Sequence, residues 1–126
     1  GAGAIMDMNG ITSKTAIPAM LFHGTVDPLV PYGTAAHHYC DTDATGWLMF
    51  FGSHSIYERY NDIGADVELH SFCGGRHGFA GAYFYKEQER VADFINRVLN
   101  GAHFQNHLIF QKGNENAPDE QVFCND

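Results

Sequence analysis

A short apolar run, Thr15–His23, constrains the fold of this chain more than any other segment. Pro18 lies near its start and Gly24 follows its end. A run of this length is typical of a strand buried on both faces, as in a parallel sheet, and a proline is tolerated near the beginning of such a strand. The next residues, Gly24–Tyr32, are rich in Gly, Asp and Pro and predict a loop. Asp27 is therefore expected just beyond the carboxyl end of a buried strand.

The rest of the chain alternates between helical and extended patterns. Alternation of strands with helices predicts an α/β fold, in which parallel strands are joined by right-handed crossovers and helices pack on the sheet. Periodicity and capping residues predict a helix that begins in Thr34–Tyr39 and a helix over Ser53–Ile63, capped by Ser53 or Ser55 and ended by Gly64. A strand over Val67–Phe72 and a loop over Cys73–Gly81 follow. The last predicted elements are a helix over Tyr85–Asn100 and an extended segment over His103–Gln111.

A glycine-flanked histidine, His77 in the sequence GGRHG, follows Asp27 by fifty positions and comes just after the predicted strand Val67–Phe72. Loops at the carboxyl ends of parallel strands lie at one edge of the sheet, so we expect Asp27 and His77 to lie close together. General acid–base catalysis by histidine needs a carboxylate that holds the imidazole in one tautomer. The pattern therefore predicts an acid–base pair, in which the nearby His23 orients the loop by hydrogen bonds.

Each residue also has a structural interpretation. Asp27 would then only cap backbone amides in a turn, and His77 would be a solvated loop residue. Their joint position after two predicted strands, with an amphipathic helix behind them, favours the acid–base pair. The sequence contains no G-x-S-x-G motif, and Ser13, Ser53, Ser55 and Ser71 all lie outside such a context. The chain is therefore predicted to supply an acid and a base without the serine nucleophile.

Composition excludes several partners and cofactors. Seven basic residues and a net charge of −8 do not provide the basic patches that nucleic acid or an anionic membrane requires. No run approaches the roughly 18 apolar residues of a transmembrane helix. The eight histidines show no metal-ligand spacing, so neither a metal nor an organic cofactor is expected.

The three cysteines, Cys40, Cys73 and Cys124, leave several states open. A Cys40–Cys73 disulfide is one, a bridge to an upstream cysteine is another, and three thiols are the third. A disulfide would indicate an exported protein, because such bonds persist in oxidising compartments. We therefore expect a secreted or periplasmic location, and a cytoplasmic one if the thiols are free.

Three segments together resemble a known family. HGTVDPLVP, from His23, resembles the acid loop of α/β-hydrolases, and GGRHGF, from Gly74, resembles their histidine loop before the final helix. With HSIYERYNDIGADVELHSF, from His54, the combination is similar to bacterial carboxylesterases and to the C-terminal parts of prolyl-oligopeptidase-like enzymes. The resemblance extends over about residues 1 to 99. It implies that Asp27 is the acid and His77 the histidine of a catalytic triad.

The resemblance also implies an organisation and an activity. Residues 1–112 would be the C-terminal segment of an α/β-hydrolase domain, with Gly1–Met6 ending the strand before the acid strand, and residues 113–126 a polar tail. The activity would be hydrolysis of small carboxylic esters through an acyl-enzyme, on a serine from an upstream segment or a companion chain. Two alternatives remain: a prolyl-oligopeptidase-like serine peptidase fragment, and a non-catalytic hydrolase-fold piece that binds or supports another chain. An open sheet edge at Gly1–Met6 would favour a homodimer.

Overall fold

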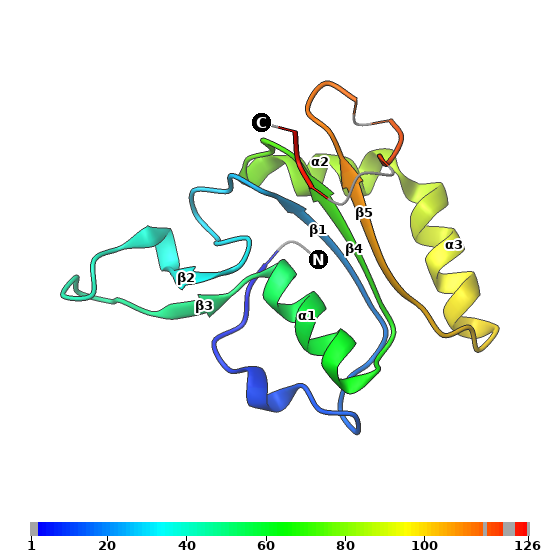
Figure 1. Cartoon of the computed structure of the whole chain (residues 1–126), viewed down its shortest axis with the longest axis horizontal. Coiled ribbons are helices and arrows are strands. Elements are labelled where there is room, and N and C mark those ends of the chain that lie inside the picture. The colour runs from blue at the N-terminus through cyan, green and yellow to red at the C-terminus, as the bar shows by residue number, and fades with distance from the viewer. Residues whose placement is uncertain (1–2, 115, 120–122, 126) are drawn as a thin grey trace.

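The computed structural model describes residues 3–114, 116–119 and 123–125, and has mixed α/β content (Figure 1). Its main sheet has three parallel strands in the order β1, β4, β5. A second sheet pairs β2 with β3 in antiparallel fashion. The elements are η1 (Met8–Gly10), β1 (Ala19–Gly24), β2 (Thr34–Ala36), η2 (His37–Tyr39), β3 (Met49–Phe51), α1 (Ser53–Ile63), β4 (Val67–Phe72), α2 (His77–Lys86), α3 (Gln88–Leu99) and β5 (Gln105–Phe110).

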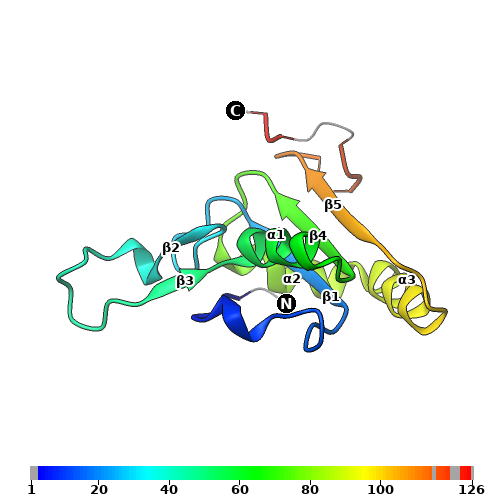
Figure 2. The same cartoon turned by 60° about the horizontal axis from the view of Figure 1, so that its bottom comes forward.

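Helices cover both faces of the parallel sheet, α1 on one and α2 with α3 on the other (Figure 2). Alternate strand residues point to opposite faces, which divides the apolar side chains into two clusters. The cluster beneath α1 consists of Ile56, Tyr60 and Val67, with Ala19 and Leu21 packed against it. The other cluster, beneath α2, consists of Phe22, Phe72, Ala80, Tyr83 and Phe110. The predicted α/β architecture with packed helices is therefore present.

The central strand β4 is buried along its whole length, although its sequence alternates between apolar and polar residues. Its polar side chains form hydrogen bonds inside the protein, and among them only Nδ1 of His70 is buried without a partner. The Glu68 carboxylate accepts hydrogen bonds from His70 Nε2 at 2.7 Å and from the Arg97 guanidinium of α3 at 2.6 Å. Burial opposes ionisation of Glu68, but the hydrogen bonds from His70 and Arg97 outweigh it and lower its pKa to about 2.

The segment Thr34–Tyr39 does not begin a helix as predicted. Thr34–Ala36 forms β2, whose partner is β3, and only the single turn η2 follows. The pairing satisfies backbone groups that a short helix would otherwise expose to solvent. His38 and Tyr39 then take left-handed backbone conformations, with φ of 52° and 53°, which stop any continuation into an α-helix.

The predicted helix over Tyr85–Asn100 is divided in two. Glu87, with φ −106° and ψ 45°, separates α2 from α3. The first of these helices begins at His77, within the segment expected to be a loop, because α2 packs on β1 and on the apolar cluster beneath it. The helix over Ser53–Ile63 agrees with its prediction and ends at Gly64, which has φ 69°. Gly52, rather than a serine, occupies its N-cap.

Residues 3–6 do not form a strand beside β1, which corrects the expectation for Gly1–Met6. Ile5 makes an isolated antiparallel bridge with Phe51, so this segment extends the hairpin sheet instead. Residues 1 and 2 lie outside the described part of the chain. Within the described residues, β1 is an edge of the parallel sheet.

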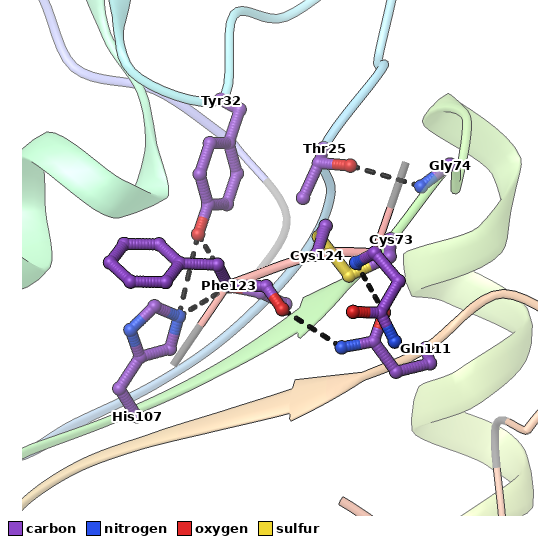
Figure 3. The surroundings of a disulfide bond; sticks show 10 residues. Thr25, Tyr32, Cys73, Gly74, His107, Gln111, Phe123 and Cys124 are labelled. Carbon is purple, nitrogen blue, oxygen red and sulfur yellow. Dashed lines mark hydrogen bonds between the residues drawn. A yellow bond between two sulfur atoms is a disulfide. The ribbon is translucent and has the colours of Figure 1, made fainter. Parts of the chain in front are cut away.

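The disulfide joins Cys73 to Cys124, not to Cys40, which is a free thiol (Figure 3). Cys73 directly follows β4, whereas Cys40 lies after η2, outside the parallel sheet. The residues around Cys124 are also held by Gln111, whose amide donates to the carbonyl of Phe123 at 2.9 Å and accepts from the backbone N–H of Asn125 at 2.8 Å. The described part of the predicted polar tail is therefore tied to the end of the sheet.

Two carboxylates contact Arg97 and offer a matched comparison. Glu68 is buried, whereas the Asp93 side chain is 67% exposed. Glu68→Gln removes a buried charge that hydrogen bonds from His70 and Arg97 stabilise, and we expect it to lower the unfolding free energy by about 2–3 kcal/mol. Asp93→Asn should cost less than about 0.5 kcal/mol. Urea unfolding at pH 7 measures the unfolding free energy of both variants. Equal losses of unfolding free energy would contradict a stabilising role for the buried Glu68 carboxylate.

The disulfide closes a loop with a sequence separation of 51 residues. In the chain-entropy description, this cross-link stabilises the folded state by roughly 4 kcal/mol. Cys124→Ser should therefore lower the unfolding free energy by about 2–4 kcal/mol, while Cys40→Ser should change it by less than about 0.5 kcal/mol. Thiol titration of the native chain should find one reactive cysteine, Cys40; three would contradict the bridge.

Candidate active site

Asp27 lies in the loop after β1, where the backbone curls around its side chain. Its Oδ1 accepts hydrogen bonds from the backbone N–H of Leu29 at 2.8 Å and of Val30 at 3.0 Å. The residue is only 4% exposed. These two bonds are the amide-capping turn that the sequence allowed as a structural interpretation, and they leave Oδ2 to face another group.

That other group is His77, the first residue of α2. Its Nδ1 lies 2.8 Å from Asp27 Oδ2. A carboxylate only accepts hydrogen bonds, so Nδ1 carries the proton, and in the neutral ring Nε2 has a free lone pair. The His77 side chain is 44% exposed, against 5% for Asp27. The structure thus brings the two predicted residues together as a buried acid and an accessible base.

The environment of Asp27 keeps it ionised. Burial alone would raise its pKa, but the hydrogen bonds from Val30, Leu29 and His77 outweigh this effect and hold the pKa below its usual value. A permanent negative charge therefore faces His77 at neutral pH. Such a charge fixes the tautomer of the ring and stabilises the imidazolium that forms when the ring takes a proton.

The loops that carry the two residues are bonded to each other. Val26 N–H donates to the carbonyl of Gly75 at 3.1 Å, and Thr25 Oγ1 accepts from Gly74 N–H at 3.0 Å (Figure 3). The contact is so close that a Cβ atom at Gly24 would overlap the carbonyl oxygen of Gly75. Gly24 is therefore required because the two backbones approach too closely for a side chain.

A cavity of about 380 Å³ is lined by the loop before His77 and by the residues on either side of it, without His77 itself. Its lining residues are Phe72, Cys73, Gly74, Gly75, Arg76, Gly78, Phe79 and Lys112. The cavity combines two aromatic residues, Phe72 and Phe79, with two cationic side chains, Arg76 and Lys112.

Three serines are engaged in hydrogen bonds away from His77. Ser53 Oγ contacts His23 Nδ1 at 2.7 Å, and Ser55 Oγ contacts Thr34 Oγ1 at 2.8 Å. Ser71 Oγ lies 2.6 Å from the Tyr32 hydroxyl and 2.7 Å from His107 Nε2. These contacts agree with the absence of a nucleophile motif from the sequence.

The cluster of Tyr32, Ser71 and His107 was not found by sequence reasoning, because its members come from a loop and two strands. Burial, with the nearby His54 and His70, lowers the pKa of His107 to about 4, so its ring is neutral at pH 7. Only the alternation along β4 could have signalled it, since Ser71 occupies a buried strand position.

Within the described residues, no group of three His, Cys, Asp or Glu side chains is placed to hold a metal ion. No helix in that part of the chain has the length and apolar character needed to cross a membrane. Comparisons with protein-family models, curated proteins and solved structures find no match to this chain.

The close approach at Gly24 predicts a sharp mutational contrast. Gly24→Ala forces the two loops apart, and we expect it to lower the unfolding free energy by about 2–3 kcal/mol. Gly78→Ala, one residue after His77, meets no neighbouring atom within 4 Å and should be neutral or stabilising by up to about 1 kcal/mol. Thermal and urea unfolding test this; similar values for the two variants would contradict the backbone contact.

The lowered pKa of His107 predicts a pH-dependent stability. Between about pH 6.5 and pH 4 the unfolded chain binds a proton at this ring that the folded chain excludes. This contribution, about 3 kcal/mol, is fully present above pH 6.5 and is lost as the pH falls to about 4. His107→Gln should flatten the stability profile in that window, while His103→Gln, at an exposed side chain, should leave the profile unchanged. If the unfolding free energy of His107→Gln changed with pH as steeply as that of the wild type, His107 would not be the group that causes this pH dependence.

Proposed function

We propose that this chain is the C-terminal portion of an α/β-hydrolase and supplies the acid and the histidine of a serine hydrolase that acts on carboxylic esters. The observation that carries the proposal is the 2.8 Å bond between the buried carboxylate of Asp27 and the accessible ring of His77. The two residues follow adjacent parallel strands, β1 and β4, in the order acid then histidine, which is the order of α/β-hydrolases.

In this mechanism the nucleophile is a serine on an upstream segment or on a companion chain. His77 Nε2 takes the proton of the serine hydroxyl as its oxygen attacks the ester carbonyl carbon. The ester C–O bond breaks, the imidazolium returns the proton to the leaving alcohol, and an acyl-enzyme remains. His77 then takes a proton from water, whose oxygen attacks the acyl carbon. The bond from the acyl carbon to the serine oxygen breaks, the imidazolium returns the proton to that oxygen, and the carboxylic acid is released.

The position of β1 supports this division of roles. In the described part of the chain it is an edge strand, so a further strand from the nucleophile-bearing segment has a place to pair. A serine on the loop after that strand would lie at the same sheet edge as Asp27 and His77. The cavity lined by Arg76, Gly78 and Phe79, which adjoin His77 in the chain, is then a candidate place for the acyl or alcohol group of the substrate.

The test uses the protein in its natural form, with any segment or chain that accompanies these residues. A fluorophosphonate probe forms a covalent bond with activated serines, and mass spectrometry then locates the labelled residue. We expect one labelled serine, outside the four named above, and hydrolysis of p-nitrophenyl esters. His77→Ala and Asp27→Asn should each lower kcat by about 10³-fold to 10⁴-fold, and His103→Ala, at an exposed side chain, should retain full activity.

Each other result overturns part of the proposal. Labelling and turnover that survive His77→Ala would exclude His77 as the base. Cleavage of a prolyl p-nitroanilide without ester hydrolysis would replace the esterase by a prolyl-oligopeptidase-like peptidase. A natural protein without any labelled serine or turnover would indicate a non-catalytic hydrolase-fold piece.

A further inference from the structure

A second histidine, His23, lies directly behind Asp27. It belongs to β1 and is 1% exposed. Its Nε2 is 3.2 Å from the carbonyl oxygen of Val30 and 3.4 Å from Oδ2 of Asp27. Its Nδ1 is 2.7 Å from Oγ of Ser53. The His23 ring therefore contacts Asp27 and Val30, the two ends of the turn that holds the carboxylate, and also contacts Ser53 at the start of α1.

The neighbours of the ring determine its tautomer. A backbone carbonyl and a carboxylate both face Nε2, and both only accept hydrogen bonds. A lone pair at Nε2 would be repelled by both, so Nε2 carries the proton. In the neutral ring Nδ1 is then an acceptor, and Ser53 must donate its hydroxyl proton to it. Burial lowers the pKa of His23 more than Val30 and Asp27 raise it, which keeps the ring neutral at pH 7.

Apart from its hydrogen bond to His23, the contacts of Ser53 indicate no further structural role. It is the first residue of α1 and is fully buried, yet the N-cap is Gly52 and no side chain caps the helix. A Cβ atom at Gly52 would overlap the carbonyl oxygen of Pro31, so the start of α1 is pressed against the end of the acid loop. This packing places Ser53 Oγ within hydrogen-bond distance of His23.

We propose that His23 and Ser53 form a positioning pair that fixes the carboxylate of Asp27 for its bond to His77. The backbone amides of Leu29 and Val30 hold Oδ1, and His23 restrains both the Val30 carbonyl and Oδ2. Ser53 prevents the His23 ring from turning by occupying its Nδ1. This inference rests on the proposed function, since it assigns a task within the same acid–base pair. Neither His23 nor Ser53 touches the reacting atoms.

The experiment measures the Asp27–His77 bond in the full chain by NMR. Ring ¹⁵N shifts report the tautomer of His77, and the exchange rate of its Nδ1 proton reports the strength of the bond to Asp27. Ser53→Ala should speed this exchange by about fivefold, the factor expected for loss of one hydrogen bond, and should mix the tautomers of His23. Ser53→Thr, which retains the hydroxyl, should restore both signals.

Ser55→Ala is the matched control. Ser55 lies on the same helix and is buried, but it bonds to Thr34 instead of the acid loop. We expect it to leave the His77 signals unchanged. His23→Gln, which keeps one donor and one acceptor, should disturb them less than His23→Leu. Circular dichroism of each variant identifies any that fails to fold. If a His23 variant fails to fold, the exchange rate measured in folded Ser53→Ala decides whether the pair positions Asp27.

The two proposals fail in different ways. If the wild-type chain shows no protected Nδ1 proton on His77, the acid–base pair itself is absent and the proposed function is wrong. If that proton is protected in the wild type and equally protected in folded Ser53→Ala, the pair stands and His23 and Ser53 do not position it. Equal effects of Ser53→Ala and Ser55→Ala would also overturn the positioning role, because they would indicate a general loosening of α1.

Discussion

Parallel pairing of β1 with β4 is the constraint on which the rest of the structure depends. The register places Gly24 beside Phe72, so the loops after the two strands leave the sheet at the same edge. Gly24 and Gly75 then let the loop backbones approach until one carbonyl oxygen fills the place of a side chain. Asp27 and His77, fifty residues apart, meet only because of this contact. Both helical layers, in turn, bury their apolar faces against the strands that hold the loops in place.

Several polar side chains lie in the interior on both faces of this small sheet. On the face covered by α2 and α3, Glu68 bonds His70 and Arg97; on the α1 face, Ser71 bonds Tyr32 and His107. Buried polar groups are tolerated when they are hydrogen-bonded and are costly when they are not. The same logic applies around Asp27, where several donors compensate for burial of its charge. Asp27 is therefore part of a polar interior in which hydrogen bonds, several of them between different elements, compensate for burial.

The sequence predicted the elements whose stability comes from one apolar face or one buried run. The helix over Ser53–Ile63, the strand over Val67–Phe72 and an extended segment near β5 all agree with the structure, although several boundaries differ. The failures share a physical cause. The β2–β3 pairing, the packing of α2 on β1 and the Cys73–Cys124 bridge all depend on contacts between residues that are not neighbours in the chain. Local propensity at Thr34–Tyr39 or Tyr85–Asn100 carries no information about such contacts, and tertiary packing overrides it.

For the candidate site, the sequence alone predicted the two residues that meet: an aspartate after a buried strand and a histidine among glycines after the next parallel strand, with no serine in a nucleophile motif. Those inferences rest on residue type and on the rule that parallel strands present their loops at one edge. Only the tertiary structure decided the rest. It made His77 the first residue of a helix, buried Asp27 while exposing its partner, and placed His23 and Ser53 behind the acid. Hydrogen-bond geometry is set to within tenths of an ångström by packing between distant segments, and no local pattern in a sequence encodes distances of that kind.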